Sequence, residues 1–225
     1  SAGGVGTPHL GRRLGAGRPH QLQDDRWASF GGVAVIEVRT EPLPITGEFP
    51  PLFALMGAHG GAGTTTLARM WAPAADTERR WPTSPLTTRR VLVVAREHMS
   101  GIAAAADVLR AALDESAPMG VTVCGLITVA AHPGRPSKDV VRYAGTVSEL
   151  APHSYRIPWV KSLIPLLHRQ LPTWRPADGI KTTQQTADGV IATVPSPIAA
   201  VGHQICEDLA ADRAAERSDP SVTVA

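Results

Sequence analysis

Three continuous apolar runs separated by helical stretches constrain the fold of this chain more than any other feature. Residues 51–57 read PLFALMG, residues 89–96 read RRVLVVAR, and residues 121–130 read VTVCGLITVA. A run that is apolar at nearly every position is typical of a strand buried on both faces. Strands that alternate with helices form right-handed βαβ units. The sequence therefore predicts an α/β fold whose mostly parallel sheet is flanked by helices.

Local signals place the other elements. Serines at helix-capping positions predict three helices, which begin at Ser100, at Ser137 and at Ser196, the last with Pro197 at its first helical position. Residues 154–159 (SYRIPW) predict a fourth strand, and residues 32–38 and 189–194 predict two more short ones. Between residues 66 and 91 we expect one short helix and a polar loop without a strand. The apolar, proline-interrupted stretch 158–174 is predicted to form a lid or a helix that packs on the core, with a partner-binding patch as the alternative.

The two ends of the chain differ from its centre. Residues 1–30 are rich in glycine, arginine and proline, which predicts a flexible tail, and residues 218–225 predict a second, short one. Residues 31–217 are expected to form a single domain. We expect this first tail to be solvated; the alternative is that its Arg12, Arg13 and Arg18, the only candidates for contact with nucleic acid, bind nucleic acid or an acidic partner.

Composition excludes several classes of protein. The net charge of +2 is too small to predict a nucleic-acid surface. No run reaches the roughly 18 apolar residues of a membrane span, so we expect a cytoplasmic chain. Cys124 and Cys206 have no metal-binding or redox spacing, which predicts two buried apolar side chains. Trp71 and Trp81 are expected in the core or at a partner surface, like Trp27.

The stretch AHGGAGTTT, residues 58–66, carries the candidate site. A strand that turns through glycines into a helix directs backbone N–H groups at one point, which suits a phosphate group. The spacing follows the phosphate-binding loop, Gly-x4-Gly-Lys-Ser/Thr, but Ala58 replaces its first glycine and Thr64 replaces its lysine. Thr65 is the candidate metal ligand. The candidate phosphate-binding residues are His59, Gly60, Gly61, Ala62, Gly63, Thr64, Thr65 and Thr66.

The segment HGGAGTTTL resembles the deviant phosphate loop of ParA/MinD-type ATPases, Lys-Gly-Gly-x-Gly-Lys-Thr-Thr. His59 and Thr64 stand at the positions of its two lysines. Residues 125–141 are similar to the MinD segment that borders the nucleotide base, which implies His132, Pro133 and Arg135 as base or rim contacts. The resemblance covers about residues 50–165. It extends to TadZ/CpaE-type proteins and to short uncharacterised actinobacterial proteins with similar loops, and it implies a bacterial adaptor.

This resemblance also implies what the chain lacks. Relatives of this kind have a strand that ends in a metal-holding Asp, whereas Asp76 and Glu78 lie in loop-like sequence here. Without the lysines and that carboxylate, little phosphoryl transfer is expected. We therefore expect a non-catalytic or weakly nucleotide-binding scaffold, for plasmid, polar-localisation or secretion-related assembly. Its expected ligand is ATP or ADP with Mg²⁺, bound weakly or not at all, and its expected partner is another protein or a second copy.

Two alternatives stay open. The chain could be an active ATPase with relocated residues, in which Arg96, Arg135 or Lys138 supplies the missing charge and Glu97 holds the metal. Arg96, Glu97 and His98 follow a predicted strand, where ligands bind in open α/β sheets. The other alternative is an empty site, with the glycines forming only a tight turn.

Overall fold

A five-stranded sheet in the order β3-β2-β5-β6-β7 forms the centre of the computed structural model, and every neighbouring pair of strands is parallel. The structure describes residues 36–114, 117–184 and 191–218, all within a unit that spans Val33–Ala225. The predicted tails lie outside these residues, apart from Ser218. The strands are β2 (Phe53–Gly57), β3 (Ala74–Asp76), β5 (Arg90–Arg96), β6 (Thr122–Val129) and β7 (His153–Ile157). This sheet confirms the predicted α/β class.

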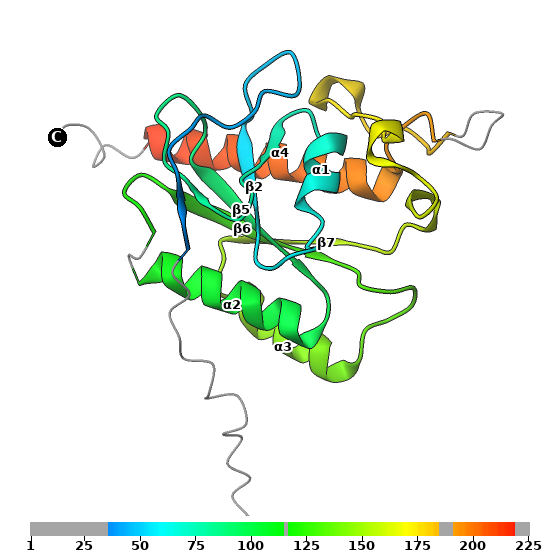
Figure 1. Ribbon diagram of the computed structural model, residues 1–225, viewed down its shortest axis with the longest axis horizontal. Coiled ribbons are helices and arrows are strands. Elements are labelled where there is room, and N and C mark those ends of the chain that lie inside the picture. Colours follow the sequence, from blue (N-terminus) through cyan, green and yellow to red (C-terminus); the bar gives the residue numbers. More distant parts are fainter. Residues whose placement is uncertain (1–35, 115–116, 185–190, 219–225) are drawn as a thin grey trace, which may run out of the picture. The chain divides into compact units, whose positions relative to one another are not determined.

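Helices cover both faces of the sheet. The helices α1 (Thr64–Met70) and α4 (Ser196–Ser218) lie on one face, and α2 (Met99–Leu113) and α3 (Lys138–Ser148) lie on the other (Figure 1). Side chains alternate along each strand, so Phe53 and Leu55 pack with the first pair of helices while Ala54 and Met56 pack on the second side. This double burial explains why the strands are continuous apolar runs.

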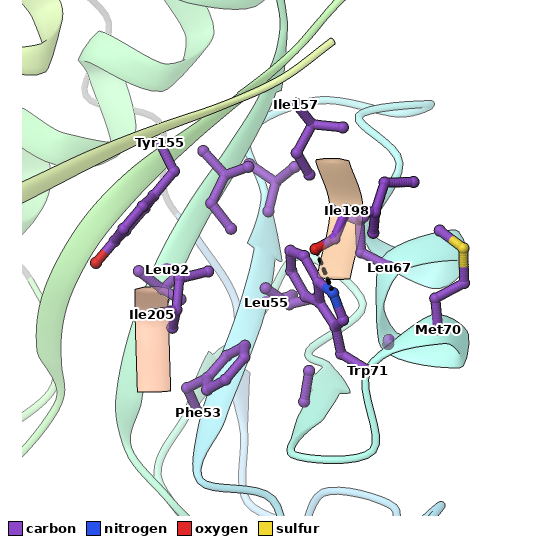
Figure 2. Packing of buried hydrophobic residues seen from close by; sticks show 14 of the residues in the cluster. Phe53, Leu55, Leu67, Met70, Trp71, Leu92, Tyr155, Ile157, Ile198 and Ile205 are labelled. Atoms are coloured by element: carbon purple, nitrogen blue, oxygen red, sulfur yellow. Dashed lines mark hydrogen bonds between the residues drawn. The ribbon is translucent and has the colours of Figure 1, made fainter. Parts of the chain in front are cut away.

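Trp71 is the largest fully buried side chain of the α1 face. Its ring packs edge-on to Phe53, and its Nε1–H donates to the carbonyl oxygen of Ile198 at 3.1 Å (Figure 2). Trp81 is 2% exposed, in the core of the other face. Both tryptophans therefore serve the core, whereas Trp27 lies outside the described residues.

Polar contacts attach α4 to the sheet. The hydroxyl of Tyr155 donates to Asp208 at 2.7 Å, and His153 Nε2 contacts Asp212 at 3.1 Å. Burial, together with the hydrogen bond to Asp208, raises the pKa of Tyr155. Arg90 pairs with Glu216 at 2.6 Å. Asp208, Asp212 and Glu216 of α4 thus contact side chains of the sheet, whereas Glu207 lies beside His203 of the same helix. Both cysteines are free, Cys124 buried and Cys206 half-buried.

The expectation of a strandless interval between residues 66 and 91 is wrong. Ala74–Asp76 forms β3 beside β2, and Trp81–Pro82 forms β4, which pairs in parallel with β1 (Val38–Arg39) in a separate two-stranded sheet. These strands are too short to show a periodic pattern, and the buried Ala74 and Ala75 pair with β2 through backbone hydrogen bonds. Tertiary pairing, which sequence propensity cannot indicate, creates them.

The helix starts agree with the sequence in one case of three. Ser137 caps α3 by accepting from the N–H of Val140. The N-cap of α2 is His98, not Ser100, because the Nδ1 of His98 accepts the N–H of Gly101 at 2.9 Å. In α4, the carbonyl oxygen of Pro195 accepts the N–H groups of Ile198 and Ala199. The helix therefore begins one residue after Pro195, and Ser196 is its first residue and not its cap.

The predicted lid is a strap of short 3-10 turns rather than one long helix. These turns are η2 (Lys161–Leu163), η3 (His168–Gln170) and η4 (Pro176–Asp178). The strap returns to α1 through a parallel bridge between Trp174 and Trp71. Of the two other predicted strands, the described part of 189–194 makes no strand, and the described part of 32–38 contributes only the first residue of β1.

Candidate functional site

The glycine loop, residues 58–63, connects β2 to α1 at the carboxyl edge of the sheet. Gly61 and Gly63 have φ angles of 77° and 106°, a backbone region that residues with a Cβ atom rarely adopt. Within the described part of the chain, the N–H groups of Gly60, Gly61 and Gly63 have no hydrogen-bond acceptor. The loop therefore presents several unpaired backbone donors close together, as phosphate-binding loops do.

The position of the glycine loop in the sheet also favours a ligand site. The chain leaves β2 through α1 to reach β3 on one side, and it leaves β5 through α2 to reach β6 on the other side. Neighbouring strands whose connections diverge in this way open a crevice at their carboxyl ends, where ligands of open α/β sheets bind. The glycine loop follows β2 and residues 97–101 follow β5, so both segments lie at this switch point.

His59, at the first lysine position, carries no charge in this arrangement. Its Nδ1 lies 2.8 Å from the carbonyl oxygen of Gly60, and its Nε2 lies 3.1 Å from the backbone nitrogen of Arg96. A carbonyl only accepts and a backbone N–H only donates, so the hydrogen is on Nδ1 and the ring is neutral. His59 thus positions the loop against β5 and does not replace a lysine. Thr64, at the second lysine position, is the first residue of α1.

Thr65 contacts an acid that the sequence reasoning dismissed. Its Oγ1 donates to Asp76 Oδ2 at 2.7 Å, and Asp76 is the last residue of β3. The other oxygen of Asp76 accepts the N–H of Glu78 at 2.9 Å. The expectation that Asp76 lies in a loop, with no strand between residues 66 and 91, is therefore wrong. A signal was present, since two alanines precede Asp76 directly after the α1 region, but the run is too short to be called a strand.

Asp76 and Thr65 fit a Mg²⁺ site that a bound phosphate ligand completes better than a site made of protein side chains alone. Mg²⁺ usually takes one or two carboxylates together with water and phosphate oxygens. The described residues contain no group of three or more His, Cys, Asp or Glu side chains that could hold a metal. One carboxylate beside one hydroxyl, next to a loop of phosphate-type donors, is the ligand set expected for a metal that arrives with a phosphate ligand.

Glu97, proposed above as a relocated metal ligand, is fully engaged. The Nε and Nη2 of Arg156 donate to its two oxygens, both at 2.7 Å, and only 7% of the Glu97 side chain is exposed. The hydrogen bonds with Glu97 raise the pKa of Arg156. Because both carboxylate oxygens are taken, Glu97 anchors the turn after β5 to β7. Sequence reasoning did not find Arg156, which is one exposed residue in a strand.

His98 and Gly101 fix the start of α2 against the glycine loop. The rings of His59 and His98 lie 5.3 Å apart. Partial burial lowers the pKa of His98, and the nearby charge of Arg96 lowers it further, so its Nδ1 is kept available as the helix cap. A Cβ at Gly101 would lie 2.4 Å from the carbonyl oxygen of Arg96. Only glycine allows this close approach.

A pocket of about 260 Å³ adjoins the loop on the α1 side of the sheet. Its walls are mostly apolar and come from the ends of β6 and β7, from α1 and from the strap. Its polar contributions come from Gly63, Thr66, Arg96 and His168. Thr66 Oγ1 and His168 Nε2 are 3.2 Å apart, which joins the strap to α1.

The remaining predicted residues are placed differently. Ala62 is buried in the core beneath the loop. His132, Pro133 and Arg135 are exposed in the connection after β6 and do not line the 260 Å³ pocket. Lys138 is exposed at the first position of α3. Of the three cations considered as replacements for lysine, only Arg96 contacts the glycine loop.

The fold and the site define an α/β protein with a parallel sheet and a lysine-free glycine loop at its topological switch point. The chain belongs to DUF6668, a family of unknown function whose model matches residues 52–167, just over half of the chain. The matched part includes the glycine loop, Asp76, Arg96 and the Glu97–Arg156 pair. No curated protein and no solved structure matches the chain. None of the described helices has the length and apolar character needed to cross a membrane.

Proposed function

We propose that this chain is a degenerate ParA/MinD-like module that binds a nucleotide weakly and acts as a scaffold or adaptor. The observation that carries the proposal is the glycine loop, whose unpaired N–H groups lie at the switch point of a parallel sheet. The loop has no lysine, and its histidine is neutral. Backbone N–H groups can hold a phosphate without a lysine, whereas phosphoryl transfer depends on positioned positive charge. The loop therefore favours binding of a nucleotide with slow or absent phosphoryl transfer.

In this proposal, the bound nucleotide sets the conformation of the chain, and a surface of the protein then contacts the partner. The setting would be plasmid, polar-localisation or secretion-related assembly in a bacterial cytoplasm, with another protein or a second copy as partner. Sedimentation velocity with and without ATP tests self-association. If mass and shape are the same with saturating nucleotide, a nucleotide-controlled self-assembly is ruled out.

Calorimetry with ATP, ADP and GTP in the presence of Mg²⁺ tests the nucleotide site. We expect saturable binding by the wild type and its loss in Gly61→Val, because a side chain at a φ of 77° distorts the loop. Gly145→Ala in α3 is the matched control, since Gly145 lacks a positive φ and a Cβ there meets nothing within 4 Å. Thr64→Lys should strengthen binding about tenfold, the effect of one charged hydrogen bond. No wild-type binding at millimolar nucleotide would leave an empty site.

Mg²⁺ dependence tests the roles of Thr65 and Asp76. When bound, Mg²⁺ would neutralise charge on the nucleotide phosphates. We expect Mg²⁺ to strengthen ATP binding by the wild type, and we expect Asp76→Asn to remove this gain while the affinity measured in EDTA stays the same. Glu78→Gln is the control, because the carboxylate of Glu78 pairs with Arg39 and Arg80 instead. An undiminished Mg²⁺ effect in Asp76→Asn would contradict the assignment.

An active ATPase is the second candidate function, and the hydrogen bond between Thr65 and Asp76 is the observation that favours it. Phosphate release measured for the wild type, for Asp76→Asn and for Thr64→Lys separates the two candidates. Turnover by the wild type that Asp76→Asn abolishes would favour the enzyme. Turnover that appears only in Thr64→Lys would favour the scaffold.

A further inference from the structure

Arg96 spans the carboxyl ends of three neighbouring strands. It ends β5, its Nε donates to the carbonyl oxygen of Gly61 at 3.2 Å, and its Nη1 donates to that of Ala130, after β6, at 2.9 Å. These two bonds hold the guanidinium against the glycine loop. A guanidinium has five N–H donors, so three of them stay available.

No acid among the described residues pairs with the charge of Arg96. Among the ion pairs of the described residues, none includes Arg96. The residues that line the 260 Å³ pocket include no Asp or Glu, and Arg96 is their only Lys or Arg. Its two protein acceptors are neutral carbonyls. A permanent positive charge at the edge of an apolar, half-enclosed space, without a counterion, favours an anion there.

The donors of the glycine loop border the same space. Gly63 lines the pocket beside Arg96, and the N–H of Gly63 has no acceptor. His59 is the only ionisable side chain of the loop. Its two hydrogen bonds require a neutral ring, so the loop itself contributes no charge. The charge for an anion at this point must therefore come from the neighbouring strand.

We propose that Arg96 is the cation of the glycine-loop site, binding the phosphate or pyrophosphate group of a ligand whose apolar part occupies the adjoining pocket. This inference rests on the proposed function for the identity of that ligand as a nucleotide. It assigns to β5 the charge that phosphate-binding loops ordinarily take from their own lysine. The apolar walls, from Leu67, Val160 and Ile198 among others, would receive the uncharged part of the ligand.

The test measures binding of sodium pyrophosphate and of Mg²⁺-ATP, separately, to the wild type, Arg96→Gln, Arg96→Lys and Arg217→Gln. We expect Arg96→Gln to weaken binding of both probes at least tenfold and to flatten the dependence of Kd on ionic strength. Arg96→Lys should keep an intermediate affinity because it keeps the charge. Arg217→Gln removes an exposed arginine at the end of α4 that makes no ion pair with a described residue, and it should bind like the wild type.

A purely structural role of Arg96 would give a different pattern. Lysine cannot reproduce both bonds to Gly61 and Ala130. If Arg96 only supported the loop, Arg96→Lys would therefore bind the probes as poorly as Arg96→Gln. Thermal unfolding of the unliganded variants checks that each is folded. Equal behaviour of the lysine and glutamine variants, or wild-type affinity in Arg96→Gln, would overturn the inference.

The two proposals fail separately. Pyrophosphate binding that depends on Arg96, without ATP binding, would support the role of Arg96 and reject the nucleotide function. ATP binding that is independent of Arg96 would do the reverse. A wild type that binds neither probe would reject both.

Discussion

Replacement of Trp71 by alanine is expected to lower the free energy of unfolding by about 3–5 kcal/mol, the usual cost of removing a fully buried tryptophan. Trp71 is 0% exposed and joins three parts of the chain that lie far apart in sequence. Its ring contacts Phe53 of β2, its indole N–H binds the start of α4, and its backbone bridges to Trp174 of the strap. Chemical denaturation followed by circular dichroism measures the loss.

Two further variants make this expectation specific. Trp71→Phe keeps an aromatic ring but loses the indole hydrogen bond to Ile198 and part of the buried ring, so we expect a smaller loss of about 1–3 kcal/mol. Met119→Ala, at a side chain that is 94% exposed, should change stability by less than about 0.5 kcal/mol. If Trp71→Ala unfolds at the same denaturant concentration as Met119→Ala, the packing described for the α1 face is wrong.

Replacement of Arg156 by methionine is expected to lower the free energy of unfolding by about 2–4 kcal/mol, because it leaves the buried carboxylate of Glu97 without a counterion. Arg156 is itself half-exposed, so most of this cost comes from Glu97. The variant should also lose order at the turn after β5, where Arg96 and His98 lie. Denaturation midpoints give the first effect, and amide hydrogen exchange of residues 96–101 gives the second.

A double-mutant cycle separates the pair from its surroundings. Glu97→Gln removes the charge that would be left unpaired, so Arg156→Met combined with Glu97→Gln should cost less than Arg156→Met alone. Arg135→Met is the control for loss of an arginine without an ion pair. If the double variant is as unstable as the sum of the single ones, the two side chains are not coupled in solution.

Local sequence was sufficient for the parts of the fold that depend on neighbouring residues. The three apolar runs predicted β2, β5 and β6, the stretch at residues 154–159 predicted part of β7, and the spacing of the glycines predicted the turn at residues 58–63. Ser137 was identified as a cap because a side-chain cap acts within three residues. His98 was missed because histidine is not among the residues that usually cap helices, although its bond to the N–H of Gly101 spans the same three residues.

The sequence by itself determined an α/β chain with a lysine-free glycine loop. The tertiary structure decided what surrounds that loop. Asp76 meets Thr65 because β3 pairs beside β2, and Arg96 reaches Gly61 because β5 lies on the other side of β2. Glu97 and Arg156 are 59 residues apart and meet across β6. Periodicity and capping are short-range properties, whereas strand order follows from burial of the whole sheet, and the charges at its carboxyl edge are brought together only by that order.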